Sequence, residues 1–304
     1  MSEPLVELRN ATVAFPGVTA LDGVDLRLYP GEVHALMGEN GAGKSTIIKA
    51  LNGVLSLDGG ELLLDGTPTT FSSPAESYAA GIATVFQDIH LGPKLNVVEN
   101  VMLGHEVRGR FGINWTETRA KAAAILADLG LDDLDLGIRL SNLNPAVQQL
   151  VAIARAMVGE PRVLLLDEPT SSLDPPAVQR LFRIIATLRD RGVAVVFVSH
   201  FLEQVYAISD RMTVLRDGKV EGEFRTRDID RVELISTMLG GDIEALRQIG
   251  SERRAHRQDP EGDPVLEAQE LAQDGVVEPV DLMLYRGEVV GFAGLRGSGR
   301  TELA

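Results

Sequence analysis

The hydrophobic pattern at the start of the chain predicts short strands that lead into an α/β core. Residues 6–8 and 12–15 alternate between apolar and polar positions, as strands with one buried face do. Residues 32–37 predict a short buried strand, and residues 46–51 predict the start of a helix. Residues 60–66 indicate a further strand followed by a turn.

The middle of the chain predicts helices, followed by two buried strands. Residues from about 96 to 157 read as mainly helical, with breaks at glycines and at an Asn-Pro pair, and with an alanine-rich helical period over 116–129. Continuous apolar runs at 163–166 and 193–198 are typical of parallel strands buried on both faces. An Asp-Gly pair within residues 212–220 indicates a hairpin. This order of elements predicts the α/β class.

Composition narrows the class of protein. The chain has 304 residues, which allows about two domains, and its net charge is −15. Such an acidic chain argues against a nucleic-acid surface and against direct binding to anionic lipid. With no cysteine, disulfides and thiolate zinc sites are excluded. The sequence contains neither a recognisable signal peptide nor an apolar run of about 20 residues, so we expect any membrane role to act through a partner.

A glycine-rich loop is the strongest chemical signal. Residues 38–46 fit the pattern G-x-x-x-x-G-K-[ST] and lie between the predicted strand at 32–37 and its following helix. In that setting, backbone N–H groups and the helix N-terminus point at a polyphosphate. Lys44 can then reach the outer phosphates, and the Ser45 hydroxyl can ligate Mg²⁺. The candidate phosphate-binding residues are Gly38, Asn40, Gly41, Gly43, Lys44, Ser45 and Thr46.

Two acidic residues follow the first of the buried runs. Asp167 and Glu168 lie where open α/β sheets place their ligands. Asp167 can hold a metal ion directly or through water, and Glu168 can polarise a water molecule against a terminal phosphate. The alternative is a charged turn without function, which the upstream glycine loop makes the weaker interpretation.

Three further side chains each have an ordinary alternative. Phe15 can stack on adenine or be a core residue. Gln87 follows the strand predicted at residues 82–86 and can reach Mg²⁺ or the attacking water, or be a surface residue. His200 follows the second buried run and can hydrogen-bond a terminal phosphate, although a single histidine is more often structural.

Taken together, the motifs resemble the ATP-binding cassette ATPases of ABC transporters over essentially residues 4–240. The resemblance rests on the glycine loop, Gln87, the helix at 152–156, Leu-Asp-Glu-Pro-Thr at 166–170, Ser-Leu-Asp at 172–174 and Val-Ser-His at 198–200. Residues 15–21 and 96–100 resemble the branch that imports simple sugars and related small solutes. The resemblance to ATP-binding cassette ATPases implies a P-loop NTPase core with a mostly parallel sheet. It also implies an N-terminal antiparallel β subdomain and a helical subdomain at about 90–160.

The resemblance also implies roles for the candidate residues. Phe15 becomes the adenine-stacking residue and Asp174 joins the nucleotide-binding residues. The implied catalytic residues are Glu168, His200, Gln87 and Lys44, and the implied Mg²⁺ residues are Ser45, Gln87 and Asp167. The implied cofactors are ATP and Mg²⁺.

An internal repeat points to a second cassette. Residues 280–289 repeat residues 24–33 at an offset of about 256 positions, and 264–267 echo 4–7 at about 260. We therefore expect one cassette at residues 1–240, a linker at 241–263 and the opening of a second cassette at 264–304, as in fused two-cassette sugar importers.

Both copies depart from the family pattern in ways that fit together. Lys44 in the first copy corresponds to Arg300 in the second. The planar guanidinium group of arginine has less freedom than a lysine ammonium group to reach the same phosphate. The signature segment, usually Leu-Ser-Gly-Gly-Gln, aligns with residues 143–147, where Pro145 lacks an N–H and Ala146 adds a Cβ. We expect one competent and one degenerate ATP site. We also expect these 304 residues alone to bind Mg-ATP but hydrolyse it poorly.

The leading interpretation is a peripheral ATPase at the cytoplasmic face of the membrane. It would contact membrane permease subunits through residues around 88–115, with Leu91, Leu95 and Val97 as candidate contacts or as core residues. A solute-binding protein would act indirectly, and no nucleic acid is expected. The alternatives are import of nucleosides or other small solutes, a ribosome-associated tandem-cassette ATPase, and a nucleotide-binding module without hydrolysis.

Overall fold

The computed structural model describes residues 3–87, 90–240, 263–273, 275, 277–292 and 299–303. The chain divides into two compact units, Met1–Ile243 and Glu244–Ala304, and each is described by itself. The linker expected at 241–263 falls, except for residue 263, outside the described residues. The same is true of residues 293–298 in the repeated glycine loop and of residues 88 and 89 in the expected permease-contacting segment.

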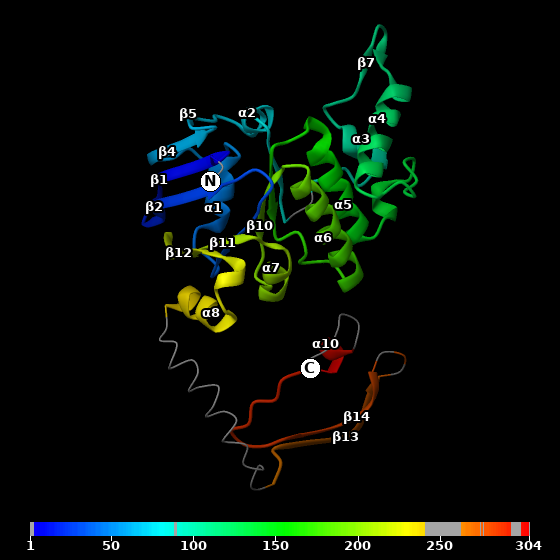
Figure 1. Ribbon diagram of the computed structural model, residues 1–304. Coiled ribbons are helices and arrows are strands. Elements are labelled where there is room, and N and C mark those ends of the chain that lie inside the picture. Colours follow the sequence, from blue (N-terminus) through cyan, green and yellow to red (C-terminus); the bar gives the residue numbers. More distant parts are fainter. Residues whose placement is uncertain are drawn as a thin grey trace. The chain divides into compact units, whose positions relative to one another are not determined.

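A six-stranded sheet forms the centre of the first unit (Figure 1), in the order β12-β11-β3-β10-β9-β6. The five strands from β11 to β6 run parallel, and β12 pairs antiparallel with β11. The bounds are β3 Val33–Gly38, β6 Ile82–Val85, β9 Val163–Asp167, β10 Ala194–Val198, β11 Arg211–Arg216 and β12 Lys219–Arg225. Strands β9 and β10 are buried on both faces along almost their whole length, as their continuous apolar runs predicted.

The N-terminal part is a separate four-stranded antiparallel sheet in the order β2-β1-β4-β5. Its strands are β1 Val6–Phe15, β2 Val18–Leu28, β4 Gly59–Leu64 and β5 Thr67–Thr69. The two runs predicted at 6–8 and 12–15 belong to one strand. A β-bulge between Leu8 and Ala11 accommodates the two polar residues between the runs while the pairing with β2 continues on both sides. Asn10, at this bulge, has φ 48°.

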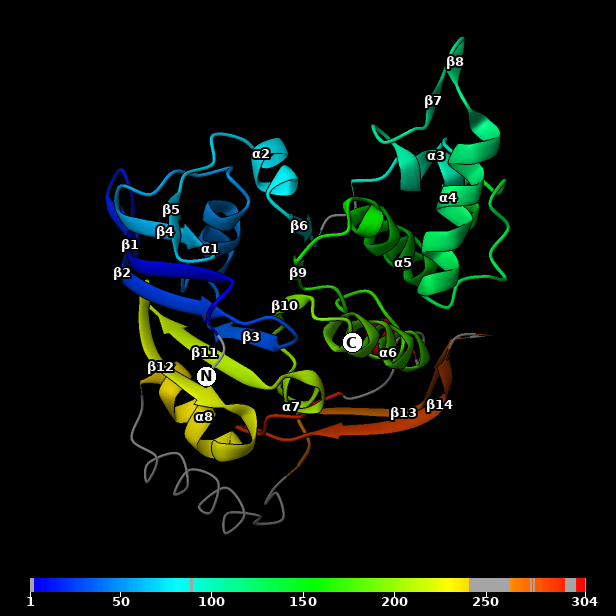
Figure 2. The same cartoon turned by 45° about the horizontal axis from the view of Figure 1, so that its top comes forward.

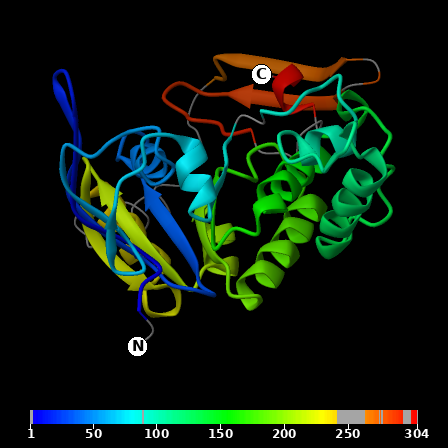
Figure 3. The same ribbon diagram turned by 90° about the horizontal axis from the view of Figure 1, so that it is seen from above.

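Helices cover both sheets and form a region of their own. The bounds are α1 Lys44–Leu51, α2 Pro74–Ala79, α3 Val97–Met102, α4 Trp115–Asp128, α5 Pro145–Ala156, α6 Pro175–Asp190, α7 Leu202–Ile208 and α8 Arg231–Leu239. Helices α3, α4 and α5 lie together to one side of the central sheet, away from the antiparallel strands (Figures 2 and 3). The predicted fold class, with its antiparallel and helical parts, is confirmed.

The segment from 96 to 157 is mainly helical and is interrupted at its glycines, as expected, although the form of the first break was not predicted. A short hairpin separates α3 from α4, formed by β7 Arg108–Gly109 and β8 Gly112–Ile113. Glycine has a low helix propensity, and three glycines within residues 104–112 favour a turn over a continuous helix. The remaining breaks contain 3-10 turns, among them η1 Leu140–Asn142 and η2 Met157–Gly159.

The second unit contains an antiparallel pair, β13 Leu266–Gln273 and β14 Val277–Leu284, and a short helix α10 Arg300–Leu303. Its pairing repeats that of β1 and β2. Leu266 pairs with Leu284 as Val6 pairs with Leu28, and the register shifts fall at corresponding positions.

Local details of the two strand pairs agree as well. Glu270 has φ 52°, close to the φ 48° of Asn10 at the corresponding bulge. The Asn10 N–H donates to Asp25 Oδ1 at 2.8 Å, and the Glu270 N–H donates to Asp281 Oδ1 at 2.8 Å. The sequence repeat is therefore also a structural repeat. The copies differ in the length of chain beyond the last corresponding pairs: seven residues separate Val13 from Leu21, whereas three separate Gln273 from Val277.

Candidate functional site

The parallel strands bring most of the candidate residues to one edge of the central sheet. Leu36 of β3 pairs with Val198 of β10, and Val198 pairs in turn with Asp167 of β9. On the far side of β9, Leu166 pairs with Val85 of β6. Because these strands are parallel and in register, their carboxyl ends lie level. The glycine loop, Glu168, His200 and Gln87 all leave the sheet at this edge.

The glycine loop is fixed by close backbone packing. Gly38 has φ 146°, and a Cβ there would lie 2.3 Å from the Leu215 carbonyl oxygen of the neighbouring strand β11. Gly43 is the residue before α1, with φ 107°. The Gly218 N–H in the β11–β12 turn donates to the Ala42 carbonyl at 3.2 Å. The loop therefore requires glycine at Gly38 both for its conformation and for space.

Replacement of Gly38 by alanine is expected to destabilise the first unit and weaken nucleotide binding. The added Cβ must displace backbone, so we expect a loss of about 3 kcal/mol or more in the free energy of unfolding. Gly41 is the matched control: its φ is 86°, but a Cβ there would meet nothing within 4 Å. Gly41→Ala should cost about 1–2 kcal/mol. Thermal unfolding of both variants measures the difference, and equal losses would contradict this account.

Lys44 opens α1 with its ammonium group turned back over the loop. Its Nζ donates to the carbonyl oxygens of Gly38 at 2.7 Å and Glu39 at 2.8 Å. Burial lowers the pKa of Lys44, while the nearby carboxylates of Glu168 and Asp167 act in the opposite direction. These interactions place the ammonium group within electrostatic reach of both acids. The site thus combines a positive loop with an acidic pair across the strand ends.

The acidic pair has an unusual local geometry. Burial, followed by the nearby charge of Glu168, raises the pKa of Asp167. Glu168 has φ 46°, a left-handed conformation that costs energy for a non-glycine residue and is often found at functional sites. Its N–H donates to the Val198 carbonyl at 3.0 Å, which fixes the residue against β10. Its Oε1 lies 3.4 Å from His200 Nδ1.

The oxygen groups of this edge suit Mg²⁺ better than a metal held wholly by protein. Asp167 supplies a half-buried carboxylate and Ser45 an exposed hydroxyl. In the described part of the chain, no group of three or more His, Cys, Asp or Glu residues could hold a metal ion. Mg²⁺ commonly takes one or two protein oxygens together with phosphate and water. The residues present fit that pattern.

Within the described residues, Phe15, Gln87 and Asp174 form no hydrogen bond with Lys44, Asp167, Glu168 or His200. Phe15 is 42% exposed at the end of β1, so it is not a core residue. Gln87 is exposed just beyond β6. Asp174 caps α6, accepting the Ala177 N–H at 2.9 Å through Oδ1. Its carboxylate therefore has a structural use in addition to the binding role that the resemblance implies.

The segment corresponding to the family signature forms the start of α5. Asn144 caps this helix, and its Oδ1 accepts the Val147 N–H at 2.9 Å. Pro145 occupies the first helical position, where it contributes no N–H. Two of the amides that would normally be free at a helix N-terminus are thus absent or already bonded.

Sequence reasoning missed one residue that organises the site. Gln204 of α7 accepts a hydrogen bond from Thr170 Oγ1 at 2.6 Å and another from Ser199 Oγ at 3.4 Å. It therefore ties the loop after Glu168 to the loop that carries His200. The contact joins residues 34 positions apart, and no local pattern marks a glutamine in the first turn of a helix.

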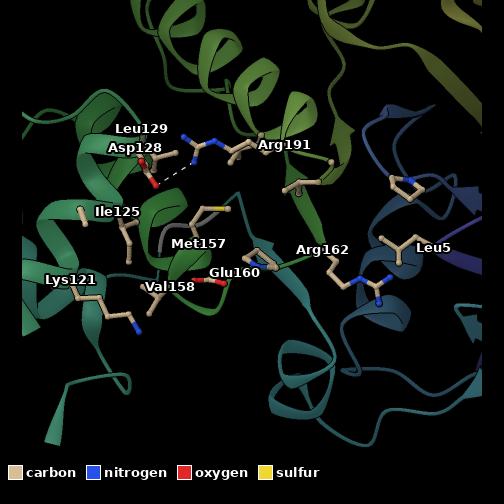
Figure 4. Close-up of a pocket in the computed structure, with 16 residues that line it drawn as sticks. Leu5, Lys121, Ile125, Asp128, Leu129, Met157, Val158, Glu160, Arg162 and Arg191 are labelled. Carbon is tan, nitrogen blue, oxygen red and sulfur yellow. Dashed lines mark hydrogen bonds and ion pairs between the residues drawn. The ribbon is translucent and has the colours of Figure 1, made fainter.

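A separate hollow of about 600 Å³ lies at the opposite, amino-terminal end of the strands (Figure 4). Helix α4, the turn before β9 and the loop before β10 line it. The Asp128–Arg191 ion pair, at 3.3 Å, joins two of these elements. None of the candidate catalytic or phosphate-binding residues lines this hollow, so it is distinct from the site at the carboxyl edge.

Comparison with known proteins agrees with this geometry. The family model described as ABC transporter matches residues 21–171, and one described as AAA domain, putative AbiEii toxin, Type IV TA system, matches residues 146–202. The chain is 54% identical over 300 residues to the fructose import ATP-binding protein FruK of Bifidobacterium longum. It is 48% identical over 303 residues to the ribose import ATP-binding protein RbsA 2 of Rubrobacter xylanophilus. These alignments cover 99% of this chain but 58% and 57% of the relatives, so the chain spans less than two thirds of their length.

Solved structures give the same assignment. The ATP-binding cassette MJ0796, in a dimeric post-hydrolysis state bound to ADP and Pi, is 30% identical with a TM-score of 0.63. The match covers 73% of this chain and 99% of that one. A nucleotide-free cassette from an ABC transporter gives a TM-score of 0.68 at 26% identity, covering 80% of this chain and 97% of the other. The chain therefore belongs to the ATP-binding cassette family of ABC transporters.

Proposed function

We propose that this chain is the ATP-hydrolysing part of a sugar importer. The observation that carries the proposal is the convergence of Lys44, Asp167, Glu168 and His200 at one edge of the parallel sheet. The sugar class is supported by relatives described as fructose, ribose and arabinose import ATP-binding proteins. Which sugar is carried would be decided by the partner subunits.

The geometry suggests how the residues divide the reaction. The loop amides and Lys44 bind the phosphate tail, and the Lys44 ammonium would exchange its carbonyl partners for phosphate oxygens. Glu168 accepts the proton of the attacking water, while His200 holds the glutamate and the terminal phosphate in position. Ser45, Asp167 and Gln87 would hold Mg²⁺, which neutralises developing charge on the phosphates when bound. Phe15 offers an exposed ring to adenine.

A groove on the first unit suits the proposed permease subunits. It has a volume of about 780 Å³ and lies between α2, strand β6 and α5, with Leu91, His105 and Arg155 among its lining residues. Asn52 Nδ2 and Thr84 Oγ1, from two other lining residues, are buried without a hydrogen-bond partner in the described chain. Leu103, which is 41% exposed, also lines the groove and offers apolar surface to a partner. Among the contacts expected earlier, Leu91 lines this groove, Leu95 is half-buried and Val97 is fully buried in the core.

The surrounding assembly is part of the same proposal. The structural repeat supports a second cassette in the same protein, opening at about residue 264. Within the described residues no helix is both long and apolar enough to cross a bilayer. We propose that the protein sits at the cytoplasmic face of the membrane, bound to permease subunits that receive solute from a separate binding protein.

Reconstitution with the permease tests the proposal. Sugar uptake into proteoliposomes should require ATP, and Arg155→Glu should reduce uptake and permease binding about tenfold or more, because it places a negative charge in a groove rich in donors. Arg183→Glu, an exposed change on α6 away from this groove, is the control and should leave both unchanged. ATP binding by the Arg155 variant should be unaltered. ATP hydrolysis that never couples to sugar uptake, or co-purification with ribosomes in place of permease, would refute the proposal.

A further inference from the structure

The β7–β8 hairpin carries a solvent-exposed aromatic residue, Phe111, at its turn. Phe111 is 96% exposed, although a large apolar side chain normally finds cover in a folded domain. Figures 1 and 2 both show the hairpin projecting beyond α3 and α4. We call Arg110 and Phe111, the two residues that join the strands, the hairpin tip.

Cationic and aromatic side chains gather around the hairpin tip. The Arg110 guanidinium carbon lies 5.5 Å from the centre of the Phe111 ring, and Arg108, two residues before Arg110, is also exposed. Ile113, on the second strand, is 43% exposed, and Trp115 at the start of α4 is 49% exposed. Aromatic rings flanked by arginine are typical of the interface between water and lipid headgroups, where the ring is buried and the cation meets phosphate.

The hairpin is firmly held at its base. The Asn114 N–H donates to the Val107 carbonyl at 2.8 Å, which extends the strand ladder. The Val107 N–H donates to the buried hydroxyl of Thr118 at 3.0 Å, and Asn114 caps α4 through the Glu117 N–H. The exposed ring is thus presented on an ordered support, as an inserting residue requires.

The hairpin also rises from the groove proposed above for the permease. Leu103 and His105 line that groove, and β7 begins three residues after His105. A permease bound in the groove would bring the hairpin to the membrane side of the cassette, so this step rests on the proposed function. We propose that the hairpin tip inserts into the headgroup region of an anionic bilayer.

The acidic net charge argues against lipid binding by the surface as a whole, but the hairpin tip is a local exception. The net charge of −15 describes the average surface, whereas lipid attraction acts within about a Debye length of the membrane. Arg108 and Arg110 lie at the projecting end. The nearest acids stay at the base, where Glu106 accepts the Gly104 N–H and Glu117 accepts the Asn114 side-chain amide. The hairpin tip is small for a protein interface, which favours lipid over the permease as its partner.

The single tryptophan provides a direct readout. Trp115 lies at the base of the hairpin, so its emission reports the approach of lipid. With vesicles of phosphatidylglycerol and phosphatidylcholine in equal parts, the 304-residue chain should show a shift to shorter wavelength that high salt reverses. Phosphatidylcholine alone should give a much weaker response. Phe111→Ser and Arg110→Glu should each weaken vesicle partition about tenfold.

Matched controls separate this effect from general changes of surface. Leu239, 51% exposed on α8, and Arg227, with a 75% exposed side chain, lie outside the hairpin. Leu239→Ser and Arg227→Glu should partition like the unmodified chain, and circular dichroism should show that all four variants are folded. Absence of vesicle binding, binding equal in all variants, or a Trp115 response only to vesicles that contain permease would overturn the inference. If vesicle binding is absent but sugar uptake is normal, the inference of lipid insertion is overturned and the proposed function stands. If the chain binds vesicles but ATP does not drive sugar uptake, the proposed function is overturned and the inference of lipid insertion stands.

Discussion

Replacement of Glu168 by glutamine is expected to stop ATP turnover while leaving ATP binding intact. Glutamine has nearly the same shape, and the backbone N–H that donates to Val198 is unchanged. The amide cannot accept a proton from water, so we expect the rate of hydrolysis to fall about 10²–10⁴-fold. Removing one negative charge near Lys44 should not weaken, and can slightly strengthen, the binding of an anionic nucleotide.

The chain provides a close control for this substitution. Glu160 also has a left-handed backbone, with φ 50°, but it lies at the opposite end of the sheet beside the hollow of Figure 4. Glu160→Gln should change neither binding nor turnover. The test is phosphate release by the permease-bound protein, paired with calorimetric titration of ATP. Turnover that survives in the Glu168 variant would mean that another group is the base.

The carboxyl edge of the sheet was predictable because one topological rule determines it. Asp167 and His200 end continuous apolar runs, and such runs form parallel strands whose carboxyl ends meet. The glycine loop follows a third predicted strand. If that strand is also parallel, the glycine loop, Asp167 and His200 must lie at the same edge of the sheet. The side chains did not need to be known for this step. Their roles in catalysis remain predictions that the substitutions above test.

Contacts over long sequence distances were not predictable in the same way. Gln204 joins two loops of the site through Thr170 and Ser199, and nothing in its local pattern separates it from a surface glutamine. Nothing in the sequence was a reason to treat Val97 and Leu91 differently as candidate permease contacts. Tertiary packing buries Val97 and leaves Leu91 in a groove. The β7–β8 hairpin was missed because two paired residues per strand are too few for a periodic signal.

The sequence repeat, which we propose opens a second cassette, leads to the second large prediction, an asymmetry between Lys44 and Arg300. In the first copy, residues 14–20 include Phe15, which is exposed and pairs with Val18. In the second copy Gln273 pairs with Val277, so only three sequence positions stand where the first copy has residues 14–20, and the segment that carries this aromatic has no counterpart. An adenine bound there would lack that stacking partner, in addition to the change from lysine to arginine.

The first copy carries the complementary defect. The resemblance to this family implies that each nucleotide would lie between the glycine loop of one cassette and the signature of another. The start of α5 supplies few free amides, because Pro145 has none and Asn144 has bonded that of Val147. From the sequences of the two copies we propose that an ATP site using Arg300 is the weak one. The site built from Lys44 would then carry nearly all hydrolysis.

Lys44→Ala should therefore reduce ATP-driven uptake about a hundredfold or more, because the phosphate tail loses its buried cation. Arg300→Ala in the same two-cassette protein should leave uptake close to normal. Arg300→Lys should not create a second active site, since neither the missing aromatic nor the capped helix is restored. Uptake assays of the three variants with one permease preparation measure the asymmetry. Equal losses for the Lys44 and Arg300 alanine variants would show that both sites must hydrolyse ATP, and the division into strong and weak sites would then be wrong.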